Sequence, residues 1–146
     1  MGTWATGPFD NDSAADFAHD VRETHGPAKR QSLLLVTLAD GTAYLRSHQA
    51  GEWGWELEHA VAAAAFVADE YTGAKQFTNC SYARGVEDDE ELSLKPYVEF
   101  GPVLPELLTA ARVFVRNLMV WMEAARTDRE WTDPVSDIRK ALNTTV

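Results

Sequence analysis

Two pairs of residues in this chain have types and a spacing suited to chemistry, because in each a carboxylate stands three positions before a histidine. Asp16 precedes His19, and Glu56 precedes His59. On a helix this spacing puts both side chains on one face, and di-iron bundle proteins hold metal with paired Glu-x-x-His segments and further carboxylates that all point inward. We expect Asp16, His19 and Asp20 to face water instead, because they lie opposite the apolar stripe that contains Phe17. The pattern therefore favours a core histidine at His59 with a hydrogen-bond partner over a metal site.

Three aspartates near the start of the chain, Asp10, Asp12 and Asp16, raise the question of a calcium site. An EF-hand loop that begins at Asp10 needs glycine at its sixth position and glutamate at its twelfth. The chain has Ala15 and Val21 at these positions, so the spacing excludes the motif. We interpret the aspartates as groups that cap the following helix and favour its positive dipole end. No metal ligand is expected among them.

Nucleophilic catalysis has little support in the sequence. Cys80 is the single cysteine, and no local signature of an activated thiol surrounds it. A Gly-rich phosphate loop, a Gly-x-Ser-x-Gly elbow, a His-Glu-x-x-His segment and a Cys-x-x-Cys pair are all missing from the chain. We expect no catalytic residue and no cofactor, so an enzyme of a familiar class is disfavoured. A single cysteine cannot form an internal disulfide, and the N-terminus lacks the basic stretch and apolar core of a signal peptide. Both observations favour a cytoplasmic protein.

The charge balance restricts the expected partners. Thirteen lysines and arginines stand against twenty-three acidic residues, which gives a formal net charge of −10. Such a chain repels nucleic-acid phosphates and anionic lipids and attracts basic proteins or cations. No apolar run approaches the roughly 20 residues of a membrane span. We therefore expect a basic protein partner, with neither nucleic acid nor membrane bound.

Tryptophan is the residue type that stands out, with five in the chain. Trp53 and Trp55 flank a glycine at the entrance to an expected helix. Tryptophans are enriched in recognition surfaces and are also ordinary core residues. For Trp53 the two interpretations are equally open, whereas Trp4, Trp121 and Trp131 are expected in the core.

Apolar residues recur with the helical period in four segments, which cover residues 13–23, 55–71, 103–126 and 132–142. Asp12 or Ser13 is expected to cap the first segment, and Pro134 is expected at the first helical position of the last. The second segment carries apolar residues on two opposite faces and many alanines. We therefore expect it to be packed on both sides as the central element of the fold.

The third segment is the longest, and Pro105 suits its first turn. Its apolar stripe indicates a core face or a surface for a partner, and it consists of Leu104, Leu107, Leu108, Ala111, Val115, Leu118, Met122 and Ala125. Val135, Ile138 and Leu142 are expected to point inward from the last segment.

Two stretches are less regular. Residues 33–45 fit two strands around the Asp40-Gly41 dipeptide, which suits a hairpin turn, and fit equally a buried helix that ends at Gly41. Residues 72–102 show no sustained period, contain several Gly and Pro residues and the acidic run from Glu87 to Glu91, and are expected to form a long irregular loop.

The opening Met-Gly-Thr-Trp-Ala-Thr-Gly-Pro-Phe-Asp-Asn-Asp-Ser-Ala-Ala-Asp resembles that of a bacterial family known as domain of unknown function 4259. In that family Trp-Gly-x-Gly-x-Phe-x-Asn-Asp precedes an alanine-rich first helix, and this chain departs from the pattern at Ala5, where glycine is usual. Residues 58–68 and 130–142 also look like the middle and final helices of that family, and residues 73–102 are unmatched. The resemblance implies a mainly helical fold, and within residues 33–45 it favours a helix followed by the Tyr44-Leu45 segment over the hairpin. It implies no function, because the family has no established activity.

The sequence thus predicts a mainly α, single-domain helical bundle of about five helices over residues 1–146. The leading functional hypothesis is a non-enzymatic cytoplasmic protein that binds a basic protein partner, as small acidic inhibitors bind basic toxins. The alternative is a small-molecule or metal-dependent site, with or without enzymatic activity, near Trp55, His59, Phe66 and the loop at 73–102. A third hypothesis is a homodimer formed through the helix at 103–126. The candidate binding residues are Trp53, Trp55, His59, Phe66, Glu87, Asp88 and Asp89.

Overall fold

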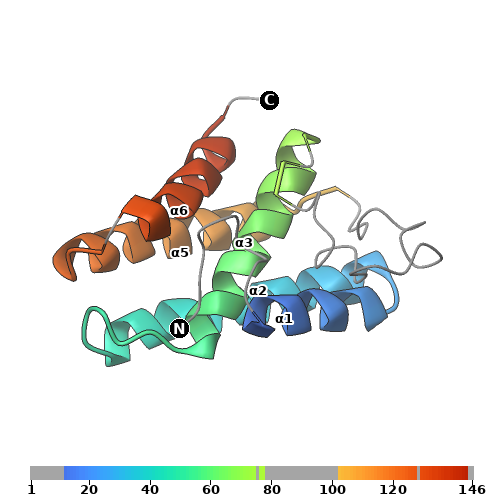
Figure 1. Ribbon diagram of the computed structural model, residues 1–146. Helices are drawn as coiled ribbons and strands as arrows, with labels where there is room; N and C mark the ends of the chain where they lie inside the picture. Colours follow the sequence, from blue (N-terminus) through green and yellow to red (C-terminus); the bar gives the residue numbers. More distant parts are fainter. Residues whose placement is uncertain (1–11, 75, 78–101, 128, 145–146) are drawn as a thin grey trace.

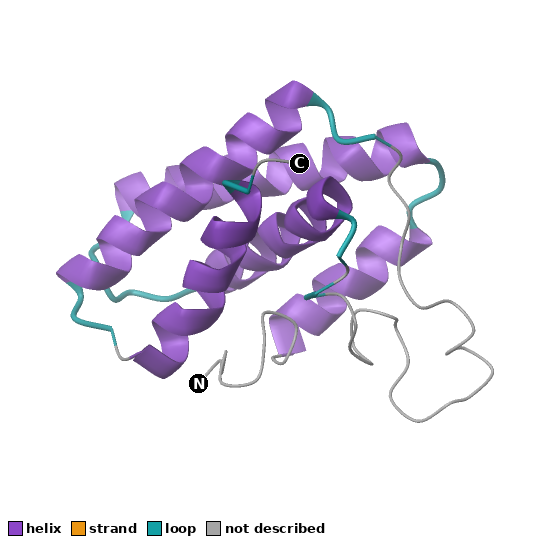
Figure 2. Cartoon of the chain, turned by 90° about the horizontal axis from the view of Figure 1, so that it is seen from above, coloured by secondary structure: helices purple, strands orange, loops and turns teal. Residues whose placement is uncertain are grey.

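The chain is all-helical in the part that its computed structural model describes, which comprises residues 12–74, 76–77, 102–127 and 129–144. These residues form five helices and no strand (Figures 1 and 2). The helices are α1 (Asp12–Glu23), α2 (Pro27–Ser47), α3 (Trp55–Thr72), α5 (Pro105–Ala124) and α6 (Arg129–Leu142). Among them, no helix combines the length and the apolar character needed to cross a lipid bilayer. The predicted all-α fold is therefore confirmed.

Helix α3 lies at the centre of this arrangement, with α1, α2, α5 and α6 packed against it. In Figure 1, α6 lies to the upper left of α3 and α1 to its lower right. Every residue from Ala60 to Asp69 is buried, so α3 is enclosed on all its faces over this stretch. The prediction that residues 55–71 form the central element is confirmed.

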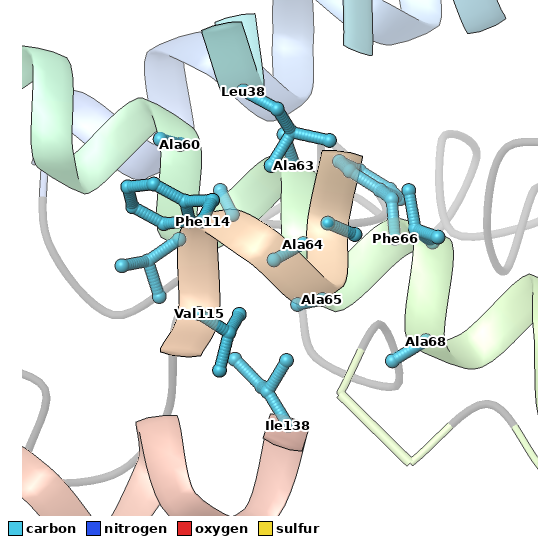
Figure 3. Packing of buried hydrophobic residues seen from close by; sticks show 14 of the residues in the cluster. Leu38, Ala60, Ala63, Ala64, Ala65, Phe66, Ala68, Phe114, Val115 and Ile138 are labelled. Carbon is cyan, nitrogen blue, oxygen red and sulfur yellow. The ribbon is translucent and has the colours of Figure 1, made fainter. Parts of the chain in front are cut away.

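Small side chains allow the neighbouring helices to approach α3 closely. Six of the ten residues from Ala60 to Asp69 are alanines. Because a methyl side chain takes little space, the backbones of the neighbouring helices can lie close to the backbone of α3. Larger side chains from the surrounding helices fill the space, and Figure 3 shows Leu38 of α2 and Phe114 of α5 over these alanines. Val115 of α5 points toward Ile138 of α6 in the same cluster (Figure 3).

Residues 33–45 belong to one continuous helix, α2, so the expectation of a helix is confirmed and the hairpin alternative is wrong. The expected helix end at Gly41 is also wrong, because α2 continues to Ser47. The physical reason lies at Gly41, which is buried inside α2 where this helix meets α3 and α5. A Cβ at Gly41 would overlap the Cβ of Ala60 and lie 2.8 Å from Cε1 of Phe114. The Asp40-Gly41 dipeptide therefore permits close packing and forms no turn.

The stripe predicted on residues 103–126 faces the core of the chain itself, and its buried members are Leu107, Ala111, Val115, Leu118 and Met122. Leu104 was expected in this stripe, but it precedes α5 and is 47% exposed. Gln31 of α2 fixes the start of α5, since its Nε2 donates to the Pro102 carbonyl at 2.8 Å and its Oε1 accepts from the Leu104 N–H at 3.4 Å. Pro105 occupies the first turn, as predicted.

The last helix starts earlier than its sequence pattern suggests. Val135, Ile138 and Leu142 are fully buried, as expected, but α6 begins at Arg129 and carries Pro134 inside it. Proline lacks an N–H, and the first four N–H groups of any helix have no intrahelical acceptor. Pro134 is the sixth residue of α6, so the prediction that it occupies the first helical position is wrong, and the helix continues past it with one N–H bond missing.

Helix α1 begins at Asp12, one residue before the predicted segment. The side chain of Asp12 and the residue before it lie outside the described residues, so the predicted capping interaction remains a prediction. The expected apolar stripe is confirmed, because Ala14, Phe17, Ala18 and Val21 are all buried.

Two interactions define where α3 ends. Gly73 adopts the left-handed conformation with φ 74°, and its N–H donates to the Asp69 carbonyl at 2.8 Å. The carboxylate of Asp69 is 2% exposed and accepts the N–H of Phe77 at 3.1 and 2.9 Å. The chain that leaves α3 is thereby held against it. Most of the segment at 72–102 that was expected to be irregular lies outside the described residues.

The close contact at Gly41 leads to a prediction about stability. Gly41→Ala should lower the free energy of unfolding by about 1–2 kcal/mol, because overpacking outweighs the gain in helix propensity. Asp40→Ala introduces the same residue at the adjacent exposed position, where we expect unchanged or higher stability. Urea unfolding of the two variants measures the difference, and a Gly41→Ala variant as stable as the wild type would contradict the packing described.

Candidate binding surface

Four aromatic rings form a row that leads from the surface into the core. Trp55 is the first residue of α3 and is 59% exposed. Its ring meets His59 edge-on, with 5.0 Å between the ring centroids. His59 in turn lies 5.3 Å from the ring of Phe17, and Phe17 lies 6.4 Å from the fully buried Phe66. We call Trp55, His59, Phe17 and Phe66 the aromatic row.

Two helices position this row. Trp55 and His59 are four residues apart on α3, which brings their side chains together on one face. Phe17 comes from α1, which packs against α3, and it fills the space between His59 and Phe66. Because Phe66 and Phe17 are buried, the row is anchored at its inner end while Trp55 remains open to solvent.

The surroundings of His59 are acidic. Burial lowers the pKa of His59 from its ordinary value of 6.5, while the charges of Asp20, Glu58 and Asp16 and a hydrogen bond with the Ser13 backbone act in the opposite direction. Asp16 and Asp20 are exposed on α1, and Glu58 is partly exposed on α3. We call Trp55, His59, Asp16, Asp20 and Glu58 the acidic aromatic surface.

The chemistry of this surface suits a cation. An indole face attracts an ammonium or guanidinium group through its quadrupole, and carboxylates beside it add a Coulomb attraction at the same place. A tryptophan side chain has few rotatable bonds, so it loses little conformational entropy when it binds a partner. The arrangement thus favours lysine or arginine side chains on a partner.

Trp53 does not join this surface. Its ring meets Trp121 of α5 edge-on, with centroids 5.4 Å apart and an interplanar angle of 88°. Trp121 is 7% exposed, as predicted for a core residue, and its indole N–H donates to the His48 carbonyl at 3.3 Å. Of the two tryptophans at the entrance to α3, Trp53 therefore packs on the core and Trp55 faces solvent.

Other candidate residues have different positions. The side chain of Phe66 is fully buried, so it supports the surface from below. His19 lies 3.9 Å from Glu23 on the exposed side of α1. In the described part of the chain, no three His, Cys, Asp or Glu residues gather as a metal-binding group. Outside the described residues lie Trp4, Asp10, Cys80, Glu87, Asp88, Asp89 and the side chain of Trp131.

Sequence reasoning missed the part that α1 plays. Phe17 was assigned to the apolar stripe and Asp16 and Asp20 to the solvent face, and both assignments are correct. The sequence gives no sign that α1 packs so that these three residues surround His59 of α3. Only the contact between the two helices brings them together.

The fold and this surface define a small all-helical protein with an exposed aromatic and acidic patch. The chain belongs to the family described as domain of unknown function (DUF4259), whose model matches residues 2–99. The match includes residues 73–99, which had seemed unlike the family, and it stops before residues 130–142, which had seemed similar to it. The opening motif and the alanine-rich helix lie inside the matched range.

Two further comparisons gave no relatives. Neither the curated proteins nor the solved structures contain a match to this chain.

Burial of His59 predicts how stability depends on pH. A lowered pKa means that the unfolded chain binds this proton more readily, so stability is fully present above pH 6.5 and falls as the pH drops through the folded-state pKa. His59→Gln should weaken this loss, which urea unfolding at pH values above and below 6.5 measures. His25→Gln changes an exposed histidine and should keep the wild-type dependence. Equal acid sensitivity of the wild type and His59→Gln would show that His59 does not contribute.

Proposed function

We propose that this protein binds a basic partner protein through the acidic aromatic surface and performs no catalysis there. The observation that supports the proposal is the exposed ring of Trp55, held edge-on against His59 with Asp16, Asp20 and Glu58 nearby. Exposed tryptophans anchored in this way are typical of residues that dominate binding energy.

The charge of the whole chain supports the same proposal. A formal net charge of −10 attracts a basic protein over distance and raises the rate of association. The local carboxylates then orient the partner, while the indole provides apolar contact area. Binding of this kind weakens as salt screens the charges.

We also propose that the protein acts in the cytoplasm of a bacterium. The single cysteine, Cys80, supports the compartment, because small secreted domains commonly depend on internal disulfides. The bacterial source rests on the resemblance of the opening motif to its family.

The first experiment identifies the partner. Cross-linking in the native host, followed by purification at low and high salt, should recover a basic protein in a salt-sensitive complex. The purified pair is then titrated by calorimetry. Recovery of no protein partner at either salt concentration would contradict the proposal.

The second experiment places the interface. Trp55→Ala should cost about 2 kcal/mol, or roughly thirtyfold in Kd, whereas Val120→Ala removes apolar area at another exposed position and should have little effect.

A charge-matched pair of variants tests the carboxylates. Asp16→Asn with Asp20→Asn should weaken binding more than Asp133→Asn with Asp137→Asn, which removes the same charge from exposed positions of α6. Equal effects of the two pairs would mean that only the total charge matters and that the acidic aromatic surface is not the interface.

A further inference from the structure

We propose that a cleft between α5 and α6 binds the phosphate group of a small ligand. The cleft has a volume of about 370 Å³ and is lined on one side by Arg112 and Arg116 of α5 and on the other by Arg139 of α6. Thr109 and Asn143 add a hydroxyl and an amide to its lining. We call it the arginine cleft.

Three arginines in one cleft are unexpected in so acidic a chain. The whole sequence has thirteen lysines and arginines for twenty-three acidic residues. Within the described residues, no carboxylate forms an ion pair with Arg112, Arg116 or Arg139. The positive charge in the cleft is therefore not neutralised by the part of the protein that surrounds it.

One of the three arginines is held in place by the fold. Nε of Arg112 donates to the Leu142 carbonyl at 2.8 Å, and its guanidinium carbon lies 5.6 Å from the centre of the Tyr71 ring. Tyr71 is itself held, because its hydroxyl donates to the Thr144 carbonyl at 2.9 Å. The two terminal nitrogens of Arg112 make no hydrogen bond to a described residue, so they remain available as donors.

The end of α6 is the unfavourable element of this site. The last carbonyls of a helix carry partial negative charge, which repels an anion. Arg112 binds the Leu142 carbonyl and so offsets part of that charge. Arg116 and Arg139 are exposed and free of described carboxylates, so they provide the charge that attracts the ligand.

The geometry favours phosphate over a single carboxylate. Arg112 and Arg116 are one helical turn apart on α5 and point from the same face, while Arg139 approaches from α6. Guanidinium groups donate paired hydrogen bonds to phosphate oxygens, and a phosphate monoester offers three such oxygens and up to two negative charges. A volume of about 370 Å³ admits the phosphate and a small organic group.

The test is a titration of the full chain with inorganic phosphate and, separately, with adenosine monophosphate. NMR at constant ionic strength monitors each titration. Acetate and adenosine serve as ligands that lack the phosphate group. We expect saturable shifts at Arg112, Arg116 and Arg139 with both phosphate compounds and not with acetate or adenosine. Tighter binding of the nucleotide than of inorganic phosphate would indicate that the cleft also holds the organic group, and equal binding would assign free phosphate as the ligand.

Two variants distinguish binding in the arginine cleft from a general effect of positive charge on the surface. Arg116→Ala should weaken phosphate binding about tenfold, the loss expected for one charge-assisted interaction, and leaves the bond between Arg112 and Leu142 intact. Arg46→Ala removes an exposed arginine from α2 and should leave the affinity unchanged. Thermal unfolding confirms that both variants are folded. Shifts that do not saturate, equal shifts with acetate, or equal weakening by Arg116→Ala and Arg46→Ala would each overturn the proposal.

Discussion

Enclosure of one helix by four others is the constraint on which this structure depends. A helix that is buried on every side needs small side chains if the neighbouring helices are to pack close to it. Helix α3 has such side chains, because six of the residues from Ala60 to Asp69 are alanines. The volume of the core then comes from the surrounding helices, in residues such as Leu38 and Phe114. Close packing of this kind leaves few voids and makes the positions of the helices mutually dependent.

The same constraint explains where the binding surface lies. Continuous burial of α3 begins at Ala60, with only Leu57 buried before it, and Trp55 at the start of the helix is exposed. Phe66 is the large residue within the enclosed stretch, and it supports Phe17, which in turn supports His59. An aromatic surface supported from the core needs little reorganisation before it binds. Helix α1 lies on one side of α3, and α5 and α6 lie on the other (Figure 1), so the carboxylates near His59 and the arginines of the cleft come from opposite sides of the same helix.

Helical periodicity was enough to predict four of the five described helices, the central place of α3 and the inward faces of α1 and α6, whereas a helix in the α2 region was favoured only by the family resemblance. It failed where a residue with a familiar local role serves packing instead. The sequence suggested a turn or a helix end at Gly41, yet this residue lies inside α2. Glycine is required there because Ala60 of α3 and Phe114 of α5 occupy the place of a Cβ. Pro134 reads as a first helical position, yet α6 starts five residues earlier.

The candidate surfaces were predictable only in part. Trp55 and His59 could be selected as a pair because they are one turn apart in one helix. Their carboxylate neighbours come from α1, and the arginine cleft joins α5 to α6. Spacing along a single segment carries no information about such contacts between helices, which depend on how the helices pack.

The meeting of Gly41, Ala60 and Phe114 has a consequence for how this family can vary. Glycine is the smallest residue, and the Cβ of any other residue at position 41 would meet both the methyl group of Ala60 and the ring of Phe114. A side chain at position 41 is therefore compatible with this helix arrangement only when the residue at 60 loses its Cβ and the residue at 114 becomes smaller. We expect the residues at positions 41, 60 and 114 to covary among related chains, because they share one space in the core. A single sequence cannot reveal such covariation.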